Sequence, residues 1–171
     1  ENSNTVQEAV QDALATILRE PVTVHGSSRT DAGVHARGQI AHFTAETVID
    51  AYRLQGSLNG VLPETIAVPT VEQVADDFHA RFHAQARLYH YYVSTEAVAI
   101  DRNFRHFIYP PSPDFERMNR AALELQNSQS FESFSLTAPQ TDHYVCIVER
   151  AEWIREPPPN HWRFEMQANR Y

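Results

Sequence analysis

The order of the expected helices and strands constrains the fold of this chain more than any other feature of the sequence. Thr5 and Glu8 have the spacing of a helix capping box, so a helix should begin there, and amphipathic periodicity predicts further helices over 49–58 and 114–126. Apolar or alternating segments predict strands over 22–25, 39–43, 65–68, 85–94, 104–109, 144–153 and 162–168. Because several strands follow strands directly, we expect an α+β fold with mixed or antiparallel sheets and helices packed on one side.

The same order indicates two parts. Asn59-Gly60 has the composition of a turn that closes the second helix. A new block begins near Asp76-Asp77. We therefore expect an N-terminal subdomain over 1–76 and a C-terminal subdomain over 77–171.

Composition excludes several classes of protein. No segment approaches the roughly 18 consecutive apolar residues of a membrane span, so no membrane partner is expected. The lone cysteine, Cys146, cannot form an internal disulfide and excludes a metal site built from clustered cysteines. No secretory leader opens the sequence, so we expect a cytoplasmic protein.

The charge balance argues against a nucleic-acid-binding protein at first sight. Fourteen cationic residues, all of them arginine, stand against 22 acidic residues, for a net charge of −8. Binding follows local patches, however, and arginine suits bidentate contact with phosphate and stacking on bases. The arginines that lie close together in sequence are Arg29 and Arg37, Arg81 and Arg87, and Arg102 and Arg105. They are either phosphate-binding groups or partners of the surplus acids on the surface.

Residues 26–38 form the most unusual stretch, a polar loop that contains three glycines. Asp31 is followed by Ala32 and Gly33, and a glycine at this point allows the positive φ of a sharp turn. Arg29, two residues before Asp31, can hold the carboxylate ionised. An ionised and oriented aspartate is a competent nucleophile or base. The alternative is an ordinary Asx turn in a surface loop.

The predicted strand over 85–94 places aromatic rings beside an arginine. Its alternation puts Arg87, Tyr89 and Tyr91 on one face and His90 and Tyr92 on the other. Aromatic rings next to arginines are the means by which proteins hold splayed-out RNA bases. Tyr89 stands out because Arg87 shares its face, although aromatics in a sheet more often belong to the core.

The nine histidines suggest a metal site. His79 and His83 have the i, i+4 spacing that can share a metal on a helix, and His35 and His42 lie in or just after the polar loop. No carboxylate stands at the spacing of a metalloprotease motif, and the phenylalanines near His79 indicate packing instead. We therefore expect no metal, and keep a metal-dependent hydrolase only as an alternative.

Several blocks together resemble one known family. The segment Gly26-Ser27-Ser28-Arg29-Thr30-Asp31-Ala32-Gly33-Val34-His35-Ala36 resembles the signature of the TruA family of tRNA pseudouridine synthases. Further blocks in matching order are Gly38-Gln39-Ile40-Ala41-His42-Phe43, Leu58-Asn59-Gly60-Val61-Leu62-Pro63, Asp77-Phe78-His79-Ala80-Arg81-Phe82, Ala86-Arg87-Leu88-Tyr89-His90-Tyr91 and Phe131-Glu132-Ser133-Phe134. The resemblance covers essentially the whole chain.

The resemblance implies an isomerase without a cofactor. Such enzymes convert uridine to pseudouridine in the anticodon arm of tRNA, at positions 38 to 40 in the bacterial family. They have the pseudouridine synthase fold, two similar subdomains with the active-site cleft between them, and they are homodimers. By position, Asp31 matches the nucleophile, Tyr89 the active-site tyrosine that stacks on the base, and Arg29 the arginine that helps to extrude the nucleotide. Arg87 and His35 are the further substrate-binding candidates.

The chain also departs from the family pattern at both ends. The family opens with a strand that carries a Tyr-Asp-Gly-Thr type of motif, and it continues past Ala168-Asn169-Arg170-Tyr171 into a helix whose arginine pairs with the catalytic aspartate. Neither segment is present. The resemblance therefore predicts that the 171-residue chain alone is a weak or inactive catalyst. The alternative function is a non-catalytic RNA-binding fragment that keeps the synthase fold.

Overall fold

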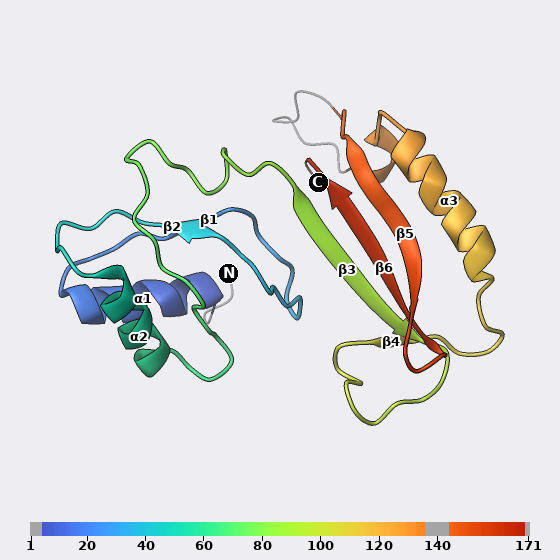
Figure 1. The fold of residues 1–171 in the computed structure, drawn as a ribbon, viewed down its shortest axis with the longest axis horizontal. Helices are drawn as coiled ribbons and strands as arrows, with labels where there is room; N and C mark the ends of the chain where they lie inside the picture. Colours follow the sequence, from blue (N-terminus) through green and yellow to red (C-terminus); the bar gives the residue numbers. More distant parts are fainter. Residues whose placement is uncertain (1–4, 136–143, 170–171) are drawn as a thin grey trace. The chain divides into compact units, whose positions relative to one another are not determined.

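The computed structural model describes residues 5–135 and 144–169 (Figure 1). The chain divides into two compact units, Glu1–Ala84 and Gln85–Tyr171. The division follows Ala84, whereas the boundary expected from the sequence follows Asp76. Each unit is described by itself below.

Two helices form the framework of the first unit. The helix α1 spans Val6–Leu18, and the Oγ1 atom of Thr5 accepts the N–H of Glu8 at 3.1 Å, so the expected cap at the start of the helix is confirmed. The helix α2 spans Ala51–Val61, and the carboxylate of Asp50 caps it in the same way. Both helices therefore begin where the sequence offers a side-chain acceptor.

The sequence prediction for the end of α2 is wrong. Asn59-Gly60 is not a turn but lies within the helix. The side chain of Asn59 reaches out of the helix instead: its Nδ2 donates to the carbonyl of Val68 at 2.8 Å, and its Oδ1 accepts the N–H of Val68 at 2.8 Å. The predicted strand over 65–68 is also wrong: these residues form no strand, and the backbone groups of Val68 bind amide side chains of α2.

The strands of the first unit are shorter than predicted. Among the residues described in this unit, the paired strands are β1, His25–Gly26, and β2, Ala41–His42, which run antiparallel. Just before β1, the N–H of Val24 donates to Gln11 at 3.0 Å and its carbonyl accepts from Gln7 at 2.9 Å. Side chains of α1 therefore satisfy a backbone segment that the sequence pattern predicts to lie in a sheet.

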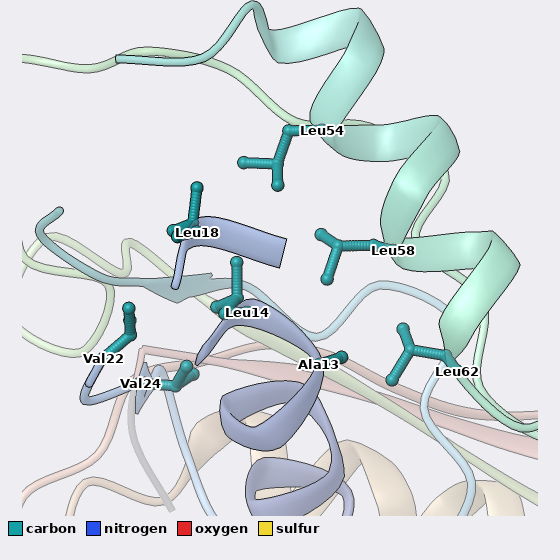
Figure 2. Packing of buried hydrophobic residues seen from close by; sticks show 8 residues of the cluster. All are labelled: Ala13, Leu14, Leu18, Val22, Val24, Leu54, Leu58 and Leu62. Carbon is teal, nitrogen blue, oxygen red and sulfur yellow. The ribbon is translucent and has the colours of Figure 1, made fainter. Parts of the chain in front are cut away.

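The core of the first unit lies between the two helices. Leu14 and Leu18 of α1 lie opposite Leu54 and Leu58 of α2, as Figure 2 shows. The buried members of this cluster are Ala13, Leu14, Leu18, Val22, Val24, Leu54, Leu58 and Leu62. The apolar face predicted for the first helix is thus the face that packs.

The second unit is built on a four-stranded mixed sheet. Its strands are β3, Arg87–Ser94; β4, His106–Phe107; β5, Val148–Glu156; and β6, His161–Ala168. In the order β4-β3-β6-β5, β3 pairs parallel with β4 and antiparallel with β6, and β5 and β6 form the predicted hairpin. The prediction of a long strand over 85–94 is confirmed, whereas the one over 104–109 shortens to the two residues of β4.

The helix α3, Phe115–Asn127, packs against β5 and covers the apolar face of the sheet. The ring of Phe115 stacks on Trp162, with centroids 3.8 Å apart, and Ala122 lies in the same core cluster as Ala151 and Ala168. Two helices with a small antiparallel pair, then a mixed sheet with one helix on it, confirm the α+β class. None of the helices in the described ranges has the length and hydropathy that a membrane crossing needs.

A charged group is buried in the other face of this sheet. The carboxylate of Glu165 on β6 is only 6% exposed. Its Oε2 lies 3.1 Å from Nε2 of His90 and 3.1 Å from Nη2 of Arg163, and its Oε1 contacts Arg150. A carboxylate can be buried at this depth because cationic partners surround it.

Candidate active site

The loop that carries Asp31 is closed at its base. β1 and β2 hold its two ends, and the N–H of Ser27 donates to the carbonyl of Ile40 at 2.8 Å. Gln39 adds a second tie: its Nε2 donates to the carbonyl of Ser28 at 2.7 Å, and its Oε1 accepts the hydroxyl of Ser27 at 3.3 Å. The two ends of the loop, Ser27-Ser28 and Gln39-Ile40, are therefore held together, and we call them its neck. The residues between Ser28 and Gln39 extend from this neck.

Within the loop, Asp31 opens a tight turn. Its carbonyl accepts the N–H of Val34 at 3.1 Å, and Gly33 has φ 82°. This is the positive φ that a type II turn needs at its third residue. A Cβ at Gly33 would meet no heavy atom within 4 Å, so the backbone angle and not lack of space favours glycine. The predicted positive-φ turn after Asp31 is present.

The loop presents its polar side chains to solvent. Arg29, Asp31 and His35 are all exposed. Among the ion pairs of the described residues, none joins Arg29 to Asp31, although the sequence suggested that this arginine holds the carboxylate ionised. The loop thus offers a carboxylate, a guanidinium and an imidazole on one short segment that is open to solvent.

Tyr89 is held in a different way, by a paired strand. On β3 it lies opposite Met166 of β6, and Arg87 lies opposite Ala168. The ladder preserves the alternation, so Arg87, Tyr89 and Tyr91 share the face on which α3 packs against β5. The ring of Tyr89 remains 37% exposed, enough to offer a stacking surface. The structure therefore groups the five predicted residues in two sets, three on the loop and two on the strand.

A histidine cluster supports the base of the loop. The ring of His42 lies 5.1 Å from that of His25 on the paired strand and 4.6 Å from that of His79. The Nδ1 atom of His42 accepts the N–H of Ala80 at 3.2 Å. Burial, together with the charges that His79 and His25 would carry, lowers the pKa of His42 from its ordinary value. The described residues contain no group of three or more histidine, cysteine or acidic side chains arranged to hold a metal ion.

Sequence reasoning missed two features of this region. Gln39 was seen only as part of a strand, yet its amide ties the neck of the loop. His25 was not connected with His42 and His79, because the three are far apart in sequence. The available signal was the pairing of the strands that flank the loop, which places His25 directly opposite His42.

Comparison with known proteins gives one consistent result. A family model described as tRNA pseudouridine synthase matches residues 1–83. The tRNA pseudouridine synthase A of Bacteroides thetaiotaomicron is 43% identical over 171 residues, which cover 99% of this chain and 63% of that relative. The enzymes of the same name from Bacteroides fragilis and Chlorobaculum tepidum are 41% and 38% identical, over 99% and 98% of this chain and 67% and 66% of those relatives. The chain thus spans 63% to 67% of the length of these relatives.

The similarity extends over nearly the whole chain, and this extent shows that it reflects membership of a family. The identity reaches across both units, over the strand that carries Tyr89 as well as the loop that carries Asp31. A chance match to one short motif would not extend over 99% of the chain. The chain belongs to the family of tRNA pseudouridine synthases.

Proposed function

We propose that this protein isomerises uridine to pseudouridine in the anticodon arm of tRNA, at positions 38 to 40, with Asp31 as the nucleophile. It does so in the cytoplasm, as a homodimer and without a cofactor. Family membership and the names of the relatives support the reaction and the substrate. The observation that carries the proposal is Asp31 itself, an exposed carboxylate on a turn whose neck is tied at Ser27, Ser28 and Gln39.

The chemistry is an isomerisation, so every carbon, nitrogen and oxygen atom of the base is kept in the product, and only the proton on C5 is exchanged for one on N1. The bond from ribose C1′ to N1 of uracil breaks, the base rotates, and a bond from C1′ to C5 forms while C5 loses its proton and N1 gains one. In our proposal the carboxylate of Asp31 attacks either C1′ or the base to open this sequence. Nothing in the sequence of bonds requires an oxidant or a reductant.

A base that detaches and rotates must first leave the helical stack. Tyr89, on the rigid β3 strand, offers a ring that replaces the lost stacking and a hydroxyl near which the C5 proton can be removed. Arg29 on the loop and Arg87 beside Tyr89 supply cations for the flanking phosphates. His35 completes the proposed substrate contacts on the loop. The proposal requires Asp31 and Tyr89 to contact the same uridine.

The test is release of tritium from tRNA labelled at C5 of uridine, with the intact protein. We expect wild type to release tritium, and Asp31→Asn to abolish release while tRNA affinity stays within about twofold, because the exchange removes a charge but keeps the shape. Asp76→Asn is the matched control, since Asp76 is an equally exposed aspartate in the same unit. Equal turnover by Asp31→Asn and Asp76→Asn would refute the role of Asp31.

The same assay distinguishes the proposed synthase from the second candidate function, a non-catalytic RNA-binding module. Tight binding of tRNA with no tritium release by wild type would identify the binding module. Release that continues in the presence of a chelator would dismiss the third candidate, a metal-dependent hydrolase.

A further inference from the structure

A pocket of about 380 Å³ lies in the second unit, lined by Ser94 at the end of β3 and by residues of the segment 97–109. Figure 1 shows the course of that segment from β3 to β4. Its walls include Ser94, Arg102, Arg105, His106, Phe107 and Tyr109. None of the described residues that line it is acidic. The pocket thus combines two guanidinium groups, an imidazole and two aromatic rings, and this chemistry favours an anionic ligand with a planar group.

Arg105 is fixed before any ligand arrives. Its Nη2 lies 3.2 Å from Oε2 of Glu156, and its guanidinium carbon lies 5.3 Å from the centre of the Tyr92 ring. The side chain is only 14% exposed, and its Nη1 finds no hydrogen-bond acceptor among the described residues. That Nη1 atom is itself buried, so Arg105 contributes to the pocket the positive charge of a guanidinium that needs little further ordering.

Two of the neighbouring carboxylates, those of Glu156 and Glu96, are already engaged. Glu156 also accepts from Nη1 of Arg163 at 3.2 Å, and Glu96 accepts from Asn160 at 2.9 Å. Arg102 is exposed and follows Asp101, whose φ of 62° turns the backbone at that point. Of the two arginines that line the pocket, Arg102 is the one open to solvent, and Arg105 is the one that contacts Glu156 and Tyr92 of the sheet.

Exposed aromatic rings stand next to these arginines. Tyr109 is 77% exposed, and its ring centre lies 4.6 Å from that of Phe107. An exposed ring beside two guanidinium groups is suited to stack on a nucleobase whose phosphate the arginines hold. The arginine pair Arg102 and Arg105 has no role in the proposed isomerisation, so it remains available for such a contact.

We propose that this pocket binds the phosphate backbone of the tRNA away from the target uridine, with Tyr109 stacked on an adjacent base. The inference rests on the proposed function and extends it to a second RNA contact. Tyr89 and Ser94 are five residues apart on β3, about 16 Å along the strand at about 3.3 Å per residue, and the alternation of the strand puts them on opposite faces of the sheet. The pocket is therefore a separate RNA contact and not an extension of the surface around Tyr89.

The test compares Arg102→Glu with Arg120→Glu, an equal change of charge at an exposed arginine on α3. We measure tRNA affinity of the intact protein over a range of salt concentrations. Arg102→Glu should weaken binding about tenfold, because a charge-assisted contact to phosphate is lost. The slope of log affinity against log salt should fall by about 0.7 to 0.9. Arg120→Glu should change neither quantity.

A second pair of variants tests the stacking. Tyr109→Ala should weaken tRNA binding about tenfold, and Tyr109→Phe, which keeps the ring, should bind like wild type. Thermal unfolding by circular dichroism checks that all variants fold. Inorganic phosphate alone should compete with tRNA only weakly, because it offers no base to stack; competition as strong as that of RNA would mean a small-anion site and overturn the proposal.

Two failures are distinguishable. If wild type releases tritium from tRNA but Arg102→Glu and Arg120→Glu bind it equally well, the pocket has no role in RNA binding and the inference is wrong. A changed oligomeric state of Arg102→Glu with unchanged tRNA affinity would likewise overturn it, in favour of a protein interface. If wild type releases no tritium while Arg102→Glu still binds tRNA more weakly than Arg120→Glu, the inference stands and the proposed reaction fails.

Discussion

The two units hold their candidate site residues by different means. In the first unit, amide side chains hold the backbone: Gln7 and Gln11 bind Val24, Asn59 binds Val68, and Gln39 ties the neck of the Asp31 loop. In the second unit, the ladder between β3 and β6 holds Tyr89 through eight paired positions on each strand. The nucleophile candidate therefore depends on a two-residue strand pair reinforced by one amide side chain, and the stacking candidate on an eight-residue ladder.

This difference predicts which substitutions are tolerated. In the first unit, Val68 lies outside the strands, so loss of the Asn59 side chain leaves its carbonyl only the longer hydrogen bond from Gln55 at 3.3 Å. In the second unit, the neighbouring rungs of the ladder remain when one side chain is lost.

The largest effect is expected from a cavity in the core of the first unit. Leu14 is 1% exposed, and Leu14→Ala should lower the free energy of unfolding by about 2 to 5 kcal/mol. Both tryptophans, Trp153 and Trp162, lie in the second unit, so their fluorescence reports on that unit alone. We expect circular dichroism to show the α1 and α2 helices melting at lower denaturant, while the tryptophan transition keeps its midpoint.

If circular dichroism and tryptophan fluorescence shifted together in Leu14→Ala, the two units would unfold as one. Their stabilities could then not be compared separately. Val93→Ala, at a residue 1% exposed on β3, is the matched cavity in the second unit. It should move the tryptophan transition and leave the helical signal of the first unit in place.

A smaller effect should follow from loss of one amide clamp. Asn59→Ala removes the hydrogen bonds to both backbone groups of Val68 and should destabilise the first unit by about 1 to 3 kcal/mol. Asn119→Ala is the control, because Asn119 binds the backbone of Trp153 in the same two-sided way. Trp153 is also paired with β6, so Asn119→Ala should destabilise less. Equal changes in the two denaturation midpoints would contradict the proposed difference between the units.

These hydrogen bonds between amide side chains and the backbone also show which parts of the fold could be predicted from the sequence and which could not. Helices with local signals were predicted, since the cap at Thr5 and the periodicity of α1 involve neighbours within a few residues. Strand lengths were not, because the partner of a backbone segment is chosen by the tertiary fold: Asn59 has the composition of a turn residue, yet it binds Val68 from within a helix. Asp31 and Tyr89 are site residues predicted from the loop motif and the strand alternation and stay predictions, whereas the hydrogen bonds of Gln39 follow only from the paired strands.

The tie at Gln39 should influence catalysis more than stability. Gln39→Ala removes the hydrogen bonds to Ser27 and Ser28, so the Asp31 loop should lose its fixed neck. Misplacement of a reacting group by about 1 Å can reduce the rate by about a hundredfold, and we expect a loss of about tenfold in kcat with little change in tRNA affinity. Gln73→Ala, at an exposed glutamine elsewhere in the unit, is the control. An unchanged kcat in Gln39→Ala would mean that the ladder of β1 and β2 alone fixes the loop.

The smallest effect is a dependence on pH that should be confined to the first unit. The Nδ1 atom of His42 accepts the N–H of Ala80, a role that only the unprotonated nitrogen can have. Burial first, and then the neighbouring His79 and His25, lower the pKa of His42 below its ordinary value of 6.5. Below pH 6.5 the unfolded state therefore binds a proton that the folded state resists, so stability falls as the pH falls through this value and is fully present above it. The helical transition of wild type should move to lower denaturant on acidification, and His42→Asn, which keeps a polar side chain without a titrating group, should reduce that movement. If the two proteins lose stability in parallel, the titrating group lies elsewhere and the first unit contains no such proton-sensitive contact.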